Sequence, residues 1–449
     1  MLNRYSNTTR SVIITIFTFL VVTLSRLYYV GHFAVPLPYW DQWDAEGDFL
    51  LRPWIQGTLK LRDLWQPHNE HRIFPTRVLS LIIFEVTGAW NNLTEARFNI
   101  LLAAAIPALL VWILCRRGEL FGIRLLLLVV VIAQFALPFS FENLLIGFQS
   151  QFYFLILFTL TSLCLATFRP FHLSTILLVL LLSVLSVLTM ASGLLTSLAA
   201  ACVYLLNWFS NSQKLTAKTL IISILLVSIT IGGYLILPQI AANQVYRARN
   251  LSDLMSAAGY ILSWPIVGTS LPAIVFWLPA CIVIPMLMFR KKLTHIDILM
   301  AGCFLWSLSQ GLAIAYGRGQ ELTEVASRYT ELFSLGLIGN AWFVIRLFEI
   351  LSNRWFQITL PIYFSVFLYG HITHYSSDMH DIRRNYRLSL MQTANVSMYL
   401  QTKDKSFLQK PKWQTPYPDP IRLQHLLDDP TLLKILPTLT SDNKKTASE

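Results

Sequence analysis

The chain has 449 residues, of which 55% are hydrophobic and only 13% are charged, and its mean hydropathy is +0.54. This composition excludes an ordinary soluble protein and predicts an integral membrane protein. The formal net charge of +11 does not indicate nucleic-acid binding, because most short connections on one side of the predicted spans are basic, as is typical of cytoplasmic loops.

Apolar runs long enough to cross roughly 30 Å of hydrocarbon recur from near the N-terminus to about residue 373. The first, 12–30, follows Arg4 and Arg10 but is long and lacks a small-residue cleavage site, so we interpret it as a retained anchor. We expect an all-α polytopic membrane protein with about eleven transmembrane helices. The predicted spans are 12–30, 98–115, 119–138, 151–168, 173–190, 194–209, 218–237, 268–289, 296–316, 331–348 and 357–373.

The basic residues set the predicted orientation. With a cytoplasmic N-terminus every cytoplasmic connection is basic, whereas an extra span at 73–88 would place residues 115–117, Cys-Arg-Arg, outside. We therefore expect 73–88, which contains Arg77 and Glu85, to be an interfacial helix on the outer surface. The basic residues of the cytoplasmic connections are Arg116, Arg117, Arg124, Arg169, Lys214, Lys218, Arg290, Lys291, Lys292, Arg346 and Arg354.

These assignments define the expected domains. A multi-span domain covers 1–373 and includes a long first extracytoplasmic loop at 31–97, and an extracytoplasmic tail covers 374–449, with a loose polar end at 441–449. The expected location is the cell (inner) membrane. The five cysteines fall in or at the ends of apolar runs, so we expect core residues rather than disulfides or metal ligands.

The first outer loop opens on an acidic and aromatic stretch, PYWDQWDAEGDF at 38–49. Acids at 41, 44 and 48 have i, i+3, i+7 spacing, so a helix beginning near Pro38 would present all three on one face. Such a cluster raises at least one carboxyl pKa, which suits a general base, or it binds a cation. The alternative is a solvated helical face beside an interfacial aromatic belt, whose tryptophans, Trp40 and Trp43, are also suited to stacking on a sugar.

Two histidines follow in the sequence HNEHR. His68 and His71, with Glu70 between them, have a spacing that allows shared metal ligation. No cysteine or third fixed ligand accompanies them, so a divalent cation is weakly supported and we assign no metal ligand and no certain cofactor. Hydrogen bonding to substrate or phosphate and a structural role remain open. The chain has no phosphate-binding glycine loop, G-x-S-x-G elbow or H-E-x-x-H helix.

Polar side chains also gather at two other places on the predicted outer side. Glu142, Gln149 and Gln151 stand between the third and fourth spans, where facing lipid would cost free energy, so we expect either ligand contacts or interhelical hydrogen bonds. Arg328 begins a late span, and Arg318 lies in the same short outer loop. A guanidinium matches two phosphate oxygens at once; headgroup snorkelling is the alternative for Arg328.

The order of these features resembles the GT-C superfamily of membrane glycosyltransferases, which use polyprenyl-phosphate-linked sugars. The resemblance covers roughly residues 10–170 and again 327–337. The family's Asp-Glu pair is replaced here by Asp-Gln at 41–42 and Asp-Ala-Glu at 44–46, and the prolines after its histidine by HNEHR, which indicates a distinct subfamily. Matching positions are Asp41 or Asp44 for the acid, Gly57 for the glycine, Pro67 and His68 for the His-Pro-Pro-like segment, Gly88 for the turn, Arg97, Arg116 and Arg117 around the second span, and Arg328 and Tyr329 for a late Arg-Tyr.

The resemblance implies a GT-C-like fold and an inverting glycosyltransferase. It would move a sugar from an undecaprenyl-phosphate-like donor to a glycan, lipid or protein acceptor at the outer face, with Asp41 or Asp44 as general base. The implied partners are this donor, the acceptor and membrane lipids, and not nucleic acid. The alternatives are a transporter or flippase of a lipid-linked glycan, a polymerase or ligase of surface polysaccharide, and a non-catalytic scaffold. The expected carrier-phosphate residues are Arg328, Tyr329 and Arg318, and the expected substrate-binding residues are Trp40, Trp43, Glu46, His68, Glu70, His71, Arg72, Glu142, Gln149 and Gln151.

Overall fold

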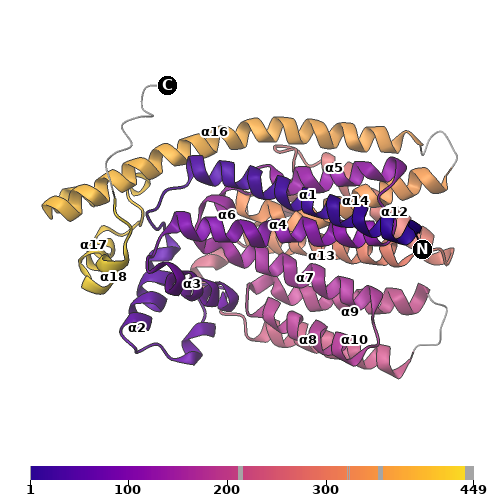
Figure 1. The fold of residues 1–449 in the computed structure, drawn as a ribbon, viewed down its shortest axis with the longest axis horizontal. Coiled ribbons are helices and arrows are strands. Elements are labelled where there is room, and N and C mark those ends of the chain that lie inside the picture. The colour runs from indigo at the N-terminus through magenta and orange to yellow at the C-terminus, as the bar shows by residue number, and fades with distance from the viewer. Residues whose placement is uncertain (1, 211–215, 321, 323, 352–356, 440–449) are drawn as a thin grey trace.

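Long helices lie side by side and form a bundle, and shorter helices gather at one end of it (Figure 1). The computed structural model describes residues 2–210, 216–320, 322, 324–351 and 357–439. Every regular element within those ranges is a helix, so the predicted all-α class is confirmed for the described chain. Lys214, Arg354 and the expected loose end at 441–449 lie outside the described residues.

Eight helices of the described chain are long and apolar enough to cross a membrane. They are α1 (Leu2–Phe33), α4 (Asn92–Arg116), α7 (Ser150–Phe168), α9 (Leu194–Ser210), α10 (Ala217–Leu235), α12 (Pro272–Phe289), α13 (His295–Arg318) and α14 (Ser327–Ile350). Each coincides with a predicted span. The three other predicted spans fall in the shorter apolar helices α5 (Leu125–Ala136) and α8 (Leu173–Val187) and in the first part of α16 (Thr359–Thr402).

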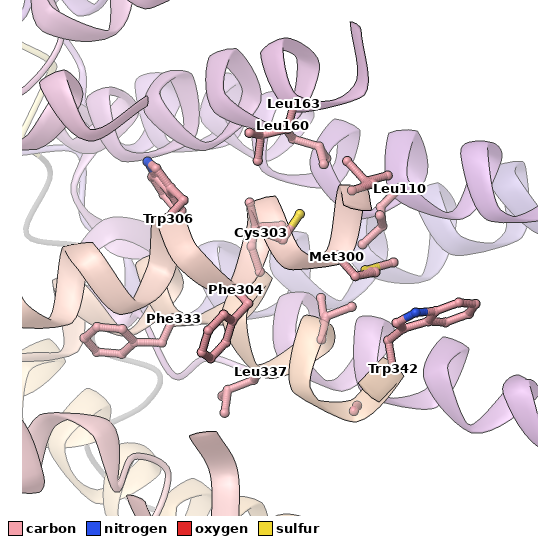
Figure 2. Close-up of a cluster of buried hydrophobic side chains, with 14 of the residues drawn as sticks. Leu110, Leu160, Leu163, Met300, Cys303, Phe304, Trp306, Phe333, Leu337 and Trp342 are labelled. Carbon is pink, nitrogen blue, oxygen red and sulfur yellow. The ribbon is translucent and has the colours of Figure 1, made fainter. Parts of the chain in front are cut away.

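The bundle core lies among α4, α7, α13 and α14. Figure 2 shows the side chains of Met300, Cys303 and Phe304 on α13 lying between leucines of α4 and α7 and large residues of α14. These side chains are almost fully buried, and between helices in a membrane such packing stabilises the bundle through van der Waals contacts. All five cysteines are unpaired.

The first loop contains a run of short helices. The acidic helix does not begin near Pro38, as predicted, but at Asp41, after Trp40 has taken a left-handed φ of 52°. It continues as the π-helix η1 (Trp43–Leu51) and α2 (Arg52–Ile55). The expected helix at 73–88 is present as α3 (Phe74–Thr87), which ends on the left-handed Gly88 as many helices do. The turn η2 (Leu61–Trp65) connects α2 with α3.

A second hydrophobic core joins the first loop to the C-terminal part of the chain. Trp43 and Trp90 from the loop pack against Tyr399, Leu423 and other residues that follow position 390. We call the two segments that share this core, residues 34–91 and 388–439, the cap; Figure 1 shows both at the same end of the bundle. Its C-terminal elements are the last turns of α16, η7 (Lys405–Phe407), η8 (Lys412–Gln414), α17 (Pro420–Asp428) and α18 (Pro430–Ile435).

The remaining elements connect the long helices. At the cap end are α6 (Phe141–Leu145), η4 (Gly147–Gln149), η5 (Ala191–Gly193), η6 (Ala241–Tyr246) and α11 (Leu251–Leu262), and η3 (Gly122–Arg124) leads into α5 at the opposite end.

Candidate functional site

The three acids of the opening stretch do not act as one group. Asp44 and Asp48 lie on the same side of η1, and both contact Arg422 of α17. Asp44 also accepts a hydrogen bond of 2.6 Å from the Tyr417 hydroxyl. Asp41, at the start of the helix, contacts His68 and not Arg422. The predicted shared face therefore holds for two acids, and they are paired with the tail.

Asp41 lies beside the turn that carries the two histidines. Its Oδ2 atom is 3.6 Å from His68 Nε2, and its side chain remains 44% exposed, so solvent and ligands can reach it. The His68 ring packs edge-on against Phe148 between α6 and α7. This contact holds the imidazole in place against the carboxylate.

The turn that carries the two histidines also contacts Arg318, through Glu70. His68 and His71 are joined by two backbone hydrogen bonds of 2.7 and 3.0 Å, which fold residues 68–71 into a tight loop. On it, Glu70 lies 3.6 Å from Arg318 Nη2 and accepts a hydrogen bond of 2.9 Å from Asn243. Asn243 in turn accepts from Arg318 Nη1 at 3.3 Å. We call Asp41, His68, Glu70, His71, Asn243 and Arg318 the loop centre.

His71 connects the loop centre to the backbone of η5. Its Nδ1 atom accepts a hydrogen bond of 3.1 Å from the backbone N–H of Ala191. The pKa of His71 is lowered to about 4, chiefly by burial; Glu70 and Asp41 oppose this lowering electrostatically, and His68 and Arg318 add to it. His71 is therefore a neutral hydrogen-bond acceptor at neutral pH. The two rings have separate partners, and no group of three or more histidine, cysteine or acidic side chains in the described chain has metal-ligating geometry.

Arg328 lies at the start of α14 and forms a different contact. Its Nη1 atom is 3.0 Å from Glu142 Oε1, and Glu142 Oε2 accepts hydrogen bonds from Ser327 Oγ and from the backbone N–H of Arg328. The guanidinium also lies over the ring of Tyr329, at 5.1 Å. Glu142 and Tyr39, two residues before Asp41, line one pocket of about 170 Å³ between the end of α1 and α16.

The glutamines and Arg72 form interhelical and loop contacts. Gln151 bonds to Gln149 at 2.8 Å and accepts from Thr76 of α3 at 3.4 Å. The bond from Thr76 to Gln151 is an interhelical hydrogen bond, one of the two roles expected from the sequence, and ligand contacts of these glutamines stay a prediction. Arg72 donates to the carbonyls of Trp65 and Ile236 and so ties the first loop to the end of α10.

Two expected substrate-binding residues lie in the interior instead. Trp43 is fully buried against Trp90 and donates to the Pro38 carbonyl. Glu46 is almost fully buried and accepts hydrogen bonds from Gln42, Ser80 and Trp90. Burial raises its pKa. This placement corrects the expectation that they face a sugar, because neither reaches solvent. Trp40 is 41% exposed and remains available.

Sequence reasoning missed a buried ion pair. Arg26 in α1 contacts Glu331 in α14, and it also donates to the Phe135 carbonyl at 2.7 Å and to the Tyr153 hydroxyl at 3.1 Å. One guanidinium thus joins α1, α5, α7 and α14. The signal was a single arginine and a single glutamate of opposite charge within two separate apolar runs, a pattern that favours a buried partner.

Comparison with known proteins identifies no relative: no protein-family model, curated protein or solved structure matches the chain.

Proposed function

We propose that the protein transfers a sugar from a polyprenyl-phosphate donor to an acceptor hydroxyl at the extracytoplasmic face of a cell membrane, in the manner of the GT-C enzymes that it resembles. The observation that supports this proposal most is the loop centre. There an accessible carboxylate, Asp41, and a phosphate-binding type of side chain, Arg318, are joined by a loop of four residues.

Asp41 is the favoured general base of the two candidates. It is accessible, and within the described chain the ring of His68, 3.6 Å away, is its one basic neighbour within ion-pair distance. Asp44 instead accepts hydrogen bonds from Arg422 at Oδ1 and from Tyr417 at Oδ2, so both of its oxygens are occupied. General-base assistance of this kind contributes about 10²–10⁴-fold to a rate.

Arg318 is the better placed of the two phosphate candidates. Its contact with Glu70 is long, at 3.6 Å, and its hydrogen bond to Asn243 is to a neutral amide, so an anionic ligand can replace these contacts at small cost. Arg328 is more firmly held, because Glu142 binds both its side chain and its backbone N–H. We therefore assign the carrier phosphate to Arg318 first and to Arg328 second.

The proposed topology keeps eleven spans, with the cap outside. The chain leaves α1 and leaves α16 on the same side of the membrane, because both segments belong to the cap. The helices from α4 to α16 must therefore cross the membrane an even number of times. Seven of the eight candidate spans follow α1, which is an odd number, so at least one further helix crosses. Two contacts support α5 as such a helix: its start meets the end of α14 through Arg124 and Glu349, and the chain after its end meets the start of α14 through Phe139 and Thr330.

The test compares two isosteric variants in membranes that retain the protein. Asp41→Asn should slow sugar transfer from a polyprenyl-phosphate donor by about 10²–10⁴-fold while leaving the amount of folded protein unchanged. Asp44→Asn is the matched control in the same helix, and we expect it to act only through a weaker cap. If Asp41→Asn transfers sugar at the wild-type rate, the assignment is wrong. If the Asp41→Asn variant moves a lipid-linked glycan across the membrane at the wild-type rate, the protein is a flippase and the transferase proposal is wrong.

A further inference from the structure

One face of α16 changes from apolar to basic along its length. Because an α-helix returns to nearly the same face after 11 or 18 residues, Ile372 and Arg383 share a face, as do Tyr369 and Arg387. Ile372 and Tyr369 are among the most exposed apolar side chains of the protein. The face that precedes the arginines therefore has the character of a lipid-facing surface.

Three arginines and a histidine then occupy this face. Arg383, Arg384 and Arg387 are exposed, and His380 lies one turn before them. None of the three guanidinium groups forms a hydrogen bond or ion pair with any residue that the structure describes, whereas Arg26, Arg124, Arg328 and Arg346 are all paired. We call Arg383, Arg384 and Arg387 the arginine face.

The opposite side of the same turns packs into the protein. Ile382 is fully buried, and Tyr386 packs edge-on against Phe33 at the end of α1, with ring centroids 5.9 Å apart. The arginine face therefore points away from the bundle and from the pocket at the end of α1. It has no protein surface opposite it in the described chain.

The depth of the arginine face along α16 corresponds to the headgroup region of a bilayer. At 1.5 Å per residue, the arginines lie about 36–42 Å along the axis from the start of α16 at Thr359. A bilayer including its headgroups is roughly 40–45 Å thick. The contact of Tyr386 with Phe33 gives the same depth independently, because Phe33 lies three residues beyond the predicted end of the first span.

We propose that the arginine face binds the phosphate groups of anionic phospholipids in the leaflet on the cap side of the membrane. Snorkelling places a long basic side chain at this depth beside any lipid. Three unpaired guanidinium groups within one and a half turns also repel one another, and anionic headgroups relieve that repulsion. A guanidinium fits phosphate oxygens in a bidentate geometry. The proposal does not depend on the sugar-transfer activity.

The experiment uses the full-length protein in detergent with an equal mixture of phosphatidylglycerol and phosphatidylcholine. Native mass spectrometry then measures the ratio of the two lipids bound. The test variant carries Arg383→Gln, Arg384→Gln and Arg387→Gln. The charge-matched control carries Lys405→Gln, Lys410→Gln and Lys412→Gln, which removes three exposed positive charges of the cap that lie beyond the last turn of α16.

Wild-type protein should prefer phosphatidylglycerol, and the arginine variant should lose this preference by a factor on the order of 100, since each basic residue at an anionic surface contributes about fivefold. The lysine control and an arginine-to-lysine triple variant should keep most of it. If the triple variant folds poorly, Arg387→Gln alone is tested instead. Its preference for phosphatidylglycerol should fall by about fivefold.

Three results would overturn the proposal. They are an unchanged preference in the arginine variants, an equal loss in the lysine control, and complete displacement of the lipid by soluble glycerol phosphate. The last would indicate a site for free phosphate rather than for a lipid surface.

Discussion

Arg422 and Asp44, 378 positions apart in the sequence, are in direct contact: the Nη2 and Nε atoms of Arg422 lie 3.2 and 3.3 Å from Asp44 Oδ1. Arg422 also reaches Asp48 one turn later. These contacts join the first loop to the C-terminal part of the cap, in addition to the apolar core that the two segments share.

Replacing Arg422 by Gln should weaken the cap. The ion pair with Asp44 is more than a third exposed on both sides, so we expect a loss of only about 1 kcal/mol in cap stability. Hydrogen exchange of α17 and α18 would measure it. Lys403→Gln, which breaks the more exposed pair with Asp428, is the control and should have a smaller effect. An equal effect of both would contradict the assigned role of Arg422.

The pair of Arg26 and Glu331 should be the most sensitive to single substitution. Arg26→Met leaves Glu331 buried without its partner, and such uncompensated charges cost about 3–5 kcal/mol. Arg26→Met combined with Glu331→Leu removes both charges and should be less destabilising than either single change. Thermal unfolding in detergent, arranged as a double-mutant cycle, measures the coupling; additive losses would show that the contact contributes nothing.

The cap should lose stability on mild acidification because of His71. Burial lowers its folded pKa to about 4, below the ordinary value of 6.5. Its contribution is therefore fully present above pH 6.5 and is lost as the pH falls from 6.5 to 4. His71→Asn, whose amide oxygen can accept from Ala191 N–H, should flatten this part of the stability profile. A profile with the same slope in the variant would assign the pH effect to another group.

A methyl group at Gly47 should disrupt the packing of η1. A Cβ atom there would lie 2.5 Å from the ring of Trp90, which is fully buried, so Gly47→Ala should cost about 1–3 kcal/mol through overpacking. Gly31→Ala in α1 is the control, since nothing lies within 4 Å of its Cβ, and it should be neutral or slightly stabilising. Thermal unfolding of the two variants checks the difference; similar melting temperatures would disprove the close contact.

Periodicity and hydropathy predicted the helices well because these signals are local. The positions of α4, α13 and α14, and the helix at 73–88, follow from runs of apolar residues and from the glycine at 88. The start of the acidic helix was misplaced by about three residues because the left-handed φ of Trp40 stops the helix from beginning near Pro38. A single sequence carries no strong signal for such a backbone conformation in a tryptophan.

The side-chain partners were predicted less well, because they depend on contacts between distant segments. Nothing near Asp44 in the sequence indicates that Arg422 will bind it, and nothing near Glu46 indicates that Ser80 and Trp90 will enclose it. The grouping of Asp41, Glu70 and Arg318 was partly foreseeable, since all three were expected on one side of the membrane. The order of these residues in the chain did not predict that Asp41 would contact His68 or that Glu70 would contact Arg318.

The helix α16 continues without interruption from the end of the bundle opposite the cap to the cap core, a length of about 66 Å for its 44 residues. Its buried side chains include Tyr363 and Phe367 in the bundle core and Val396 and Tyr399 in the cap core. One rigid element therefore belongs to both cores, so the direction that α16 takes in the bundle also sets the position of the C-terminal part of the cap.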